Sequence, residues 1–272
     1  MTTLRLSKHH GLGNDFLVVI DLADRHPLGP AAVAALCDRH RGVGADGVIR
    51  VLAGGDDADV TMVLRNADGS EAEMSGNGIR CLAQAVLDAG VVPGPEVVVA
   101  TGAGPRRCSV SPDDAPGAVR VSVDMGVVSV AAGDEVVPVP GGERSWRGRW
   151  VAAGNPHLVL VAEDLAALDL GRLGPVLQAS RPEGVNVEWI RAGPGENEVA
   201  LRVWERGAGE TLACGTGSTA AALAARSLGL VPGPAVVVHN PGGDLAVDCS
   251  GPTPRLCGPA QRVATMEVEV EP

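Results

Sequence analysis

Hydrophobic and polar residues alternate in short runs along the whole chain, as in β-strands with one face towards a core. In residues 119–124 (VRVSVD), for example, every second residue is apolar. These runs predict strands over residues 4–8, 16–20, 48–52, 60–65, 96–101, 119–125, 149–153, 157–162, 186–191, 199–205, 235–239 and 263–270. We therefore expect largely antiparallel sheets.

Helical patterns are fewer, and three segments carry them. Residues 30–40 begin with a proline, which is favoured at the first position of a helix. Residues 76–89 and 215–228 each begin with a pair of glycines and continue into an alanine-rich stretch. Both are followed by the sequence Val-Pro-Gly-Pro, at residues 92–95 and 231–234, so the same signal ends both predicted helices.

The two glycine-led helices belong to a longer duplication. Residues 71–78 read EAEMSGNG and residues 210–217 read ETLACGTG, and Cys214 follows Ser75 by 139 positions, about half the chain. The duplication predicts two related domains, residues 1–118 with 262–272 and residues 119–261. The fold class we expect is α+β, with each domain a curled, mostly antiparallel sheet or barrel around a central helix.

Composition narrows the classes of protein that fit. Hydrophobic residues make up 45% of the 272, but there is no Tyr and Phe16 is the only Phe, so we expect cores of Val, Leu, Ala and Ile. A net charge of −11 argues against nucleic acid or an anionic membrane as partner. The first residues hold no apolar signal segment, and residues 212–231 contain Arg226 among small residues. We therefore expect a cytoplasmic protein.

No metal or cofactor is expected. The six cysteines form no C-x-x-C pair and no histidines cluster, which argues against zinc. Lys8 is the only lysine, so pyridoxal phosphate has no suitable Schiff-base partner. The G-x-G-x-x-G pattern at residues 42–47 leads into a strand, and the similar residues 215–220 lack a following acidic residue, so neither predicts a dinucleotide site.

The duplicated motif has a chemical meaning. A side chain just before the glycines lies at a helix N-terminus, where free N–H groups and the helix dipole favour anions. Two such ends facing one another would hold a carboxylate and place one proton-transferring side chain on each side of it. Five of the six cysteines are expected to be ordinary free thiols. Cys214, at a predicted helix start, is the exception, and the pattern favours inversion at a carbon acid.

Eight motifs give the chain a resemblance to a known family. They are residues 10–16 (HGLGNDF), 42–47 (GVGADG), 66–70 (NADGS), 76–81 (GNGIRC), 154–157 (GNPH), 186–188 (NVE), 205–211 (ERGAGET) and 213–217 (ACGTG). In this order they resemble diaminopimelate epimerase across nearly the whole chain. The resemblance implies a pseudo-symmetric two-domain fold whose last strand returns to the first domain. It also implies cofactor-independent interconversion of LL- and meso-diaminopimelate in lysine and cell-wall synthesis.

The resemblance also implies roles for individual residues and a small molecule as substrate. A homodimer is possible. Cys214 would be one of two catalytic thiols. The reacting carboxylate would be held by backbone N–H groups around Gly76, Asn77, Gly215 and Thr216, and the reacting end would be lined by Asn14, Asn155 and His157. The distal carboxylate would be bound by Asn66, Asn186 and Arg206, with Glu205 and Arg206 near the distal amine. Plainer explanations are turn-forming asparagines, a core histidine and a surface arginine.

Ser75 stands where the family pattern has its second cysteine. A thiol has a pKa of about 8.5, and we expect a helix N-terminus to lower it, whereas an alcohol is a far weaker acid. Ser75 could be a natural variant that keeps full or reduced activity, an engineered substitution, or a sign of altered chemistry. The alternatives to diaminopimelate epimerisation are a single-base relative acting on another amino acid and a non-catalytic amino-acid-binding protein.

Overall fold

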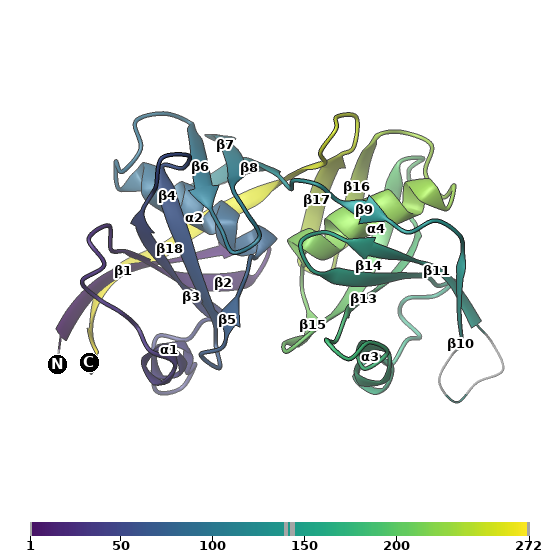
Figure 1. The fold of residues 1–272 in the computed structure, drawn as a ribbon, viewed down its shortest axis with the longest axis horizontal. Coiled ribbons are helices and arrows are strands. Elements are labelled where there is room, and N and C mark those ends of the chain that lie inside the picture. Colours follow the sequence, from purple (N-terminus) through teal and green to yellow (C-terminus); the bar gives the residue numbers. More distant parts are fainter. Residues whose placement is uncertain (1, 139–140, 142–144, 271–272) are drawn as a thin grey trace. The chain divides into compact units, whose positions relative to one another are not determined.

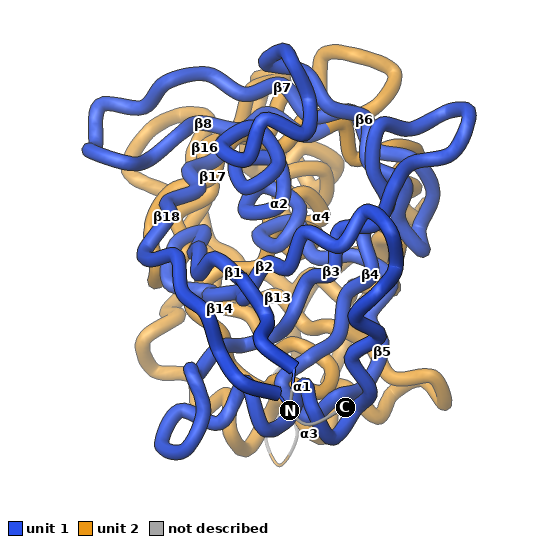
Figure 2. Tube along the Cα trace, turned by 90° about the vertical axis from the view of Figure 1, so that its left-hand side faces the viewer, with its two compact units in different colours: residues 1–123, 258–272 blue, residues 124–257 orange. Residues whose placement is uncertain are grey.

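The computed structural model describes residues 2–138, 141 and 145–270, and the chain divides into two compact units (Figure 2). Unit 1 comprises residues 1–123 and 258–272, and unit 2 comprises residues 124–257. The domain boundaries expected from the sequence, after residues 118 and 261, lie within a few residues of these divisions. The chain therefore leaves unit 1, completes unit 2 and returns to unit 1.

Unit 1 is a closed barrel. Its strands are β1 (Thr2–Gly11), β2 (Asn14–Ile20), β3 (Gly47–Ala53), β4 (Val60–Asn66), β5 (Glu71–Ala72), β6 (Glu96–Ala100), β7 (Arg106–Pro112), β8 (Ala118–Asp124) and the greater part of β18 (Arg255–Val270). Pairing runs β1–β2–β3–β4–β6–β7–β8–β18 and returns to β1, so the ring closes. The pairs β2–β3 and β4–β6 are parallel, whereas β1–β2, β3–β4, β6–β7, β7–β8 and β1–β18 are antiparallel.

Helix α2 (Gly76–Asp88) fills the middle of this barrel (Figure 1). It contacts β1, β2, β3 and β7, and every residue from Gly76 to Val86 is buried. A helix that is enclosed on all sides carries mostly small or apolar residues, which explains the glycine- and alanine-rich sequence. The barrel thus fixes the position of the helix N-terminus, where Ser75 lies.

Unit 2 repeats this order around helix α4 (Gly215–Ser227). Its strands are β9 (Ser129–Val130), β10 (Glu135–Pro138), β11 (Ser145–Ala152), β12 (Pro156–Val161), β13 (Asn186–Ala192), β14 (Glu198–Glu205), β15 (Gly209–Thr211), β16 (Ala235–Asn240), β17 (Gly243–Asp248) and the first residues of β18. Pairing runs β9–β11–β12–β13–β14–β16–β17–β18. Helix α4 contacts strands along most of this series, including β11, β13, β14 and β16.

The parallel crossovers show that the two units are duplicates. In unit 1, α1 (Pro30–Cys37) joins the parallel strands β2 and β3, and in unit 2, α3 (Leu170–Gln178) joins the parallel strands β12 and β13. Helices α2 and α4 occupy the second crossover of each unit, between β4 and β6 and between β14 and β16. Both helices have 13 residues and start 139 positions apart. The α+β fold class is confirmed.

The two hydrophobic cores differ in composition. In unit 1, aliphatic residues under α1 dominate, as expected. In unit 2, Trp146 and Trp189 are buried with their rings edge to face at 6.0 Å, so this core contains two large aromatic residues besides the expected aliphatic ones. Trp204 packs over helix α3, where a Cβ on Gly174 would lie 2.2 Å from the ring. Glycine is therefore required at position 174.

Two local differences from the predicted elements have clear causes. The helix predicted over residues 30–40 ends at Cys37, because the Asp38 carboxylate accepts hydrogen bonds from the N–H groups of His40 and Arg41 and forms a turn. Helix α3 was not predicted, since it contains Pro175 and two glycines. Among the described residues, none of the helices has the length and hydropathy of a membrane span.

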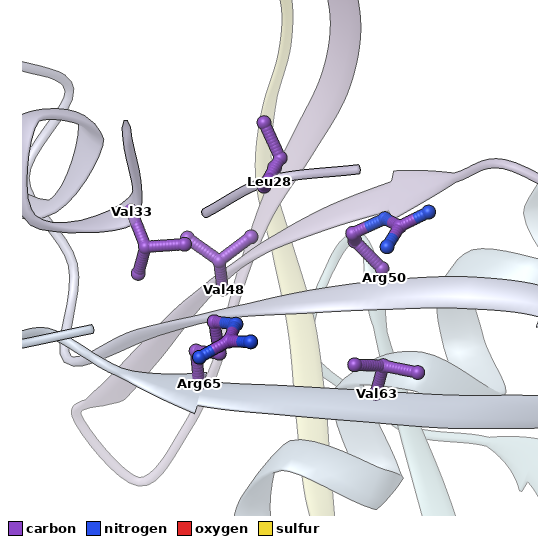
Figure 3. A pocket seen from close by; sticks show the side chains of 6 residues that line it. All are labelled: Leu28, Val33, Val48, Arg50, Val63 and Arg65. Carbon is purple, nitrogen blue, oxygen red and sulfur yellow. The ribbon is translucent and has the colours of Figure 1, made fainter. Parts of the chain in front are cut away.

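A small hollow lies on unit 1 near α1, lined by Leu28, Val33, Val48, Arg50, Val63 and Arg65 (Figure 3). The Arg50 guanidinium forms ion pairs with Asp21 and Asp24, and that of Arg65 binds Glu71 and the Gly69 carbonyl. None of the candidate site residues lines this hollow. The two guanidinium groups that line the hollow are therefore already paired with groups of unit 1.

Candidate active site

Ser75 is the N-cap of α2 in unit 1. Its backbone is extended, with φ −130° and ψ 125°, and its Oγ accepts a hydrogen bond from the Gly78 N–H at 3.1 Å. Ser75 therefore sits beside the free N–H groups that begin the helix. A Cβ built on Gly78 would lie 3.2 Å from Ile49 Cδ1, 3.2 Å from Ser75 Cβ and 3.3 Å from Met62 Cε. Gly78, beside this cap, therefore faces two apolar side chains.

A chain of hydrogen bonds orders the polar side chains at the same end of α2. Arg80, which is fully buried, donates to Asn77 Oδ1 at 2.8 Å, Asn77 Nδ2 donates to Asn14 Oδ1 at 3.2 Å, and Asn14 Nδ2 donates to Asp46 Oδ2 at 2.7 Å. Unit 1 thereby brings together Asn14, Asn77 and the helix start. Asn66 lies apart from this chain in an exposed turn, where its Nδ2 donates to Ser70 Oγ at 3.0 Å.

Cys214 is the N-cap of α4 in unit 2. Its backbone is extended like that of Ser75, with φ −128° and ψ 119°, and its Sγ accepts from the Gly217 N–H at 3.3 Å. Thr216 Oγ1 lies 3.5 Å from the same sulfur. Gly215 and Thr216 are both buried in the first turn. The two caps are therefore built alike, although one carries an alcohol and the other a thiol.

The surroundings of Cys214 are acidic. A Cβ on Gly217 would lie 2.8 Å from Glu188 Oε1 and 3.2 Å from Cys214 Sγ, so the carboxylate and the sulfur flank one point beside this glycine. Glu205, the last residue of β14, accepts a hydrogen bond from Thr211 Oγ1. Burial raises the pKa of Glu205, and the hydrogen bonds of Thr211 and Cys214 with its carboxylate oppose that rise.

These neighbours determine the ionisation of the thiol. Burial, followed by the carboxylates of Glu205 and Glu188, raises the pKa of Cys214 well above its ordinary value, and the hydrogen bonds of Thr216 and Gly217 only partly oppose this. The expectation of a lowered pKa at a helix N-terminus is wrong for Cys214. The helix end supplies partial charge, whereas burial and two nearby carboxylates disfavour the thiolate more strongly.

His157 is held between two polar side chains rather than packed as a plain core histidine. It is fully buried on β12, with Nδ1 2.7 Å from Glu188 Oε1 and Nε2 2.7 Å from Asn155 Oδ1. Strands β12 and β13 pair in parallel, with His157 opposite Asn186. This register places Glu188 next to the ring.

Asn186 and Arg206 are also brought together in unit 2. The Arg206 backbone N–H donates to Asn186 Oδ1 at 2.8 Å, and the Arg206 guanidinium donates to the Glu183 carbonyl at 2.8 Å. Asn186 is buried, whereas Arg206 is exposed. The side chain of Glu205 contacts Thr211 and Cys214, so it lies near the thiol of the α4 cap.

Comparison with known proteins identifies the family. Residues 6–131 and 149–263 match the family model of diaminopimelate epimerase. The diaminopimelate epimerase of Mycobacterium avium (strain 104) is 40% identical over 289 residues that cover 98% of each chain. That of Synechococcus sp. (strain JA-3-3Ab) is 44% identical over 264 residues, 90% of each chain. The chain belongs to the diaminopimelate epimerase family. It is therefore an isomerase, an amino-acid epimerase that uses no pyridoxal phosphate, in a family whose role is lysine biosynthesis.

The fold is shared beyond the diaminopimelate epimerase family. A hydroxyproline epimerase from Agrobacterium vitis, solved with bound trans-4-hydroxy-L-proline, has a TM-score of 0.75 and is 19% identical. The match covers 98% of this chain and 92% of that one. At this identity the likeness concerns the fold alone.

The duplication shows how the two caps of this epimerase differ. An offset of 139 positions relates Ile49 to Glu188 and Asn66 to Glu205. The strand registers likewise relate Phe16, which lies opposite Gly47, to His157, which lies opposite Asn186. The acid–base groups around Cys214 thus correspond to apolar or amide side chains in unit 1.

Three of the residues in these networks were not assigned a role from sequence. Glu188 was noticed only as part of the motif at residues 186–188, and Asp46 and Arg80 only as parts of the motifs at residues 42–47 and 76–81. A signal for Glu188 does exist, because it is an acidic residue inside a strand whose first five residues are all buried.

Three of the other cysteines, Cys37, Cys81 and Cys108, are buried within unit 1. Cys81 lies inside α2, and burial raises its pKa to about 12. Burial likewise raises the pKa of Cys108 to about 12 and that of Cys37 to about 11. These thiols are protonated at neutral pH, as expected for cysteines in a core.

Proposed function

We propose that this protein epimerises diaminopimelate between its LL and meso forms, with Cys214 on one face of the α-carbon and Ser75 on the other. The observation that carries the proposal is the pair of matching helix caps, each presenting a side chain that can transfer a proton. Membership of the diaminopimelate epimerase family supports the substrate. The proposal requires that both caps meet one substrate.

The substrate carboxylate is bound, in this proposal, by backbone N–H groups of Gly76, Asn77, Gly215 and Thr216. Helix N-termini favour anions, since their first N–H groups have no partner within the helix. The distal carboxylate is bound by Asn66, Asn186 and Arg206, because a guanidinium and amide groups fix the orientation of a carboxylate.

The proton transfers start at Cys214. Its thiol gives its proton to Glu205, which is hydrogen bonded to it, and the resulting thiolate removes the α-proton of the substrate. The α-carbanion then takes a proton from Ser75 Oγ on the opposite face, and water returns a proton to Oγ. Glu205 loses its proton to solvent, so the count of protons is unchanged.

The step at Ser75 limits the reaction. An alcohol is a much weaker acid than a thiol, and Ile49 and Met62 beside it supply no base. The carbanion therefore returns more often to the Cys214 face, where the proton can exchange with solvent. We expect α-hydrogen exchange with retention to be faster than inversion.

Incubation of diaminopimelate in deuterated water tests the proposal. The Ser75→Cys variant restores a thiol on the second face and should raise the rate of inversion by about 10²-fold or more. Ser109→Cys, which adds a thiol on β7, should leave the rate unchanged, and Cys214→Ser should abolish exchange. Labelling is followed by mass spectrometry and stereochemistry by chiral chromatography.

The same experiment separates the alternatives. Exchange with retention only, with no gain of inversion in Ser75→Cys, would indicate a single-base enzyme. Tight binding of diaminopimelate without exchange by either protein would indicate a binding protein. Exchange of other amino acids in preference to diaminopimelate would replace the substrate that we propose.

A further inference from the structure

Glu188 is a buried acidic residue to which the proposed proton transfers assign no part. Its side chain is 0% exposed, and its Oε1 pairs with His157 Nδ1 at 2.7 Å. Its second oxygen, Oε2, has no hydrogen-bond partner within the described part of the chain. A carboxylate with so little hydrogen bonding in a protein interior is stable as an anion only beside a cation.

His157 can be that cation. Its two ring nitrogens each face an oxygen at 2.7 Å, Glu188 Oε1 on one side and Asn155 Oδ1 on the other. A neutral imidazole has one N–H group and a protonated one has two. The ring donates both hydrogen bonds only when it carries both protons, and the resulting charge then balances the Glu188 carboxylate.

The second of these bonds orients Asn155. Because Asn155 Oδ1 accepts from His157, its amide nitrogen points elsewhere, and it donates to no other described residue. Asn14, which lies two residues before Phe16 as Asn155 lies two residues before His157, differs in this respect. Its Oδ1 accepts from Asn77 and its Nδ2 donates to Asp46, so both ends of its amide are used within the fold.

The ring and its partners lie beside the reacting thiol. The charged and titratable groups around them are Glu188 from β13, Glu205 from β14 and Cys214 at the start of α4. In unit 1 the position of Glu188 is taken by Ile49 and that of His157 by Phe16. The arrangement is therefore particular to the Cys214 side of the duplication.

We infer that Glu188 is a positioning residue of the active site: it keeps His157 doubly protonated, and through this ring it fixes the Asn155 amide with its N–H groups towards the substrate carboxylate. The inference rests on the proposed function for the identity of the ligand. The hydrogen-bond arrangement itself can be tested without any ligand.

The first test is the ¹⁵N spectrum of the protein labelled at its six histidines. His157 is assigned from the signal lost in His157→Gln. In the unmodified protein at neutral pH, both of its ring nitrogens should give the shifts of protonated nitrogen, because each faces an oxygen at 2.7 Å. In Glu188→Gln one of them should move to the shift of an unprotonated nitrogen. An unprotonated nitrogen of His157 at neutral pH in the unmodified protein would overturn the inference, whether or not the variant folds.

The second test is kinetic. Glu188→Gln should lower kcat/KM for α-hydrogen exchange by about tenfold or more, because the amide donor for the carboxylate loses its orientation. Glu198→Gln is the matched control, since Glu198 also pairs with a histidine, His239, at 3.0 Å but on the partly exposed side of β14. That variant should retain full activity.

The two tests can fail separately. Full activity of Glu188→Gln, with the spectral change present, would overturn the positioning role. An unmodified protein that exchanges no α-hydrogen of diaminopimelate would overturn the proposed function and the positioning role with it, while the histidine spectrum still decides the ion pair.

Discussion

At the scale of single residues, the chemistry of the two helix caps depends on what lies next to them. Ser75 and Cys214 have nearly the same backbone conformation. The side chain of each accepts a hydrogen bond from the backbone N–H of the third residue of its helix. Ile49 and Met62 lie beside the first, and Glu188 and Glu205 act on the second. A thiol next to two carboxylates stays protonated until a base accepts its proton.

A pH titration of Cys214 reactivity tests this description. Burial and the carboxylates of Glu205 and Glu188 raise its pKa, so alkylation by iodoacetamide should be slow at pH 7 and should accelerate only well above the ordinary thiol range. Glu205→Gln removes one negative charge and should lower that pKa, with about a tenfold gain in rate at fixed pH for each unit. Modification of Cys214 is followed by peptide mass spectrometry.

The comparison with Glu205→Gln has two informative outcomes. The variant should react faster with the alkylating reagent and yet exchange substrate hydrogen more slowly, since the acceptor for the thiol proton is gone. An unchanged alkylation profile would mean that the carboxylate does not control the thiol.

At the scale of elements, the first turn of each central helix contains a glycine, Gly78 in α2 and Gly217 in α4. The side chains that surround these two glycines differ. On helix propensity alone, alanine is favoured over glycine by about 1 kcal/mol. At Gly217 a Cβ would lie 2.8 Å from the Glu188 carboxylate and 3.2 Å from Cys214 Sγ, and both groups are fixed by hydrogen bonds. At Gly78 it would meet the tips of Ile49 and Met62 at 3.2 and 3.3 Å, which can rotate away.

The two glycine-to-alanine variants should therefore differ. Gly217→Ala displaces the carboxylate or the thiol and should lower kcat by about tenfold or more, with a loss of stability. Gly78→Ala should keep or slightly raise the free energy of unfolding. Urea denaturation and the exchange assay measure both quantities, and an equal effect of the two variants would contradict this account of the caps.

The positions of the two central helices could be predicted from the sequence. The helices predicted over residues 76–89 and 215–228 differ from α2 and α4 by one residue at the C-terminal end, because local propensity and the glycine pairs define them. The partnership of His157 with Glu188 could not be predicted. It depends on the register of β12 against β13, which is set by packing across the sheet rather than by either strand alone.

At the scale of the whole molecule, the chain is a duplication in which the halves have diverged in chemistry more than in fold. The same order of strands and crossovers surrounds α2 and α4, yet acid–base groups gather around α4. The sequence repeat predicted the duplication. Closure of the first barrel by β18 could be expected only from the family resemblance, since its partners β1 and β8 are distant in sequence.

Removal of the end of β18 should show how much unit 1 depends on it. Residues Ala264–Val270 pair with Thr2–Lys8, and Met266, Val268 and Val270 pack against the aliphatic core that contains Leu4 and Leu6. A chain that ends at Arg262 should lose several kcal/mol of stability, about 1 to 2 kcal/mol for each apolar side chain lost. Thermal unfolding monitored by circular dichroism measures the change, and an unaltered transition would contradict a closed barrel.

The path of β18 also has a consequence for biosynthesis. Residues 124–257, which form unit 2, are contiguous, so they can fold as soon as they have left the ribosome. The first 123 residues emerge earlier, but their barrel lacks one of its strands until β18 has been translated. The half of the protein that is made first is therefore the half that is finished last.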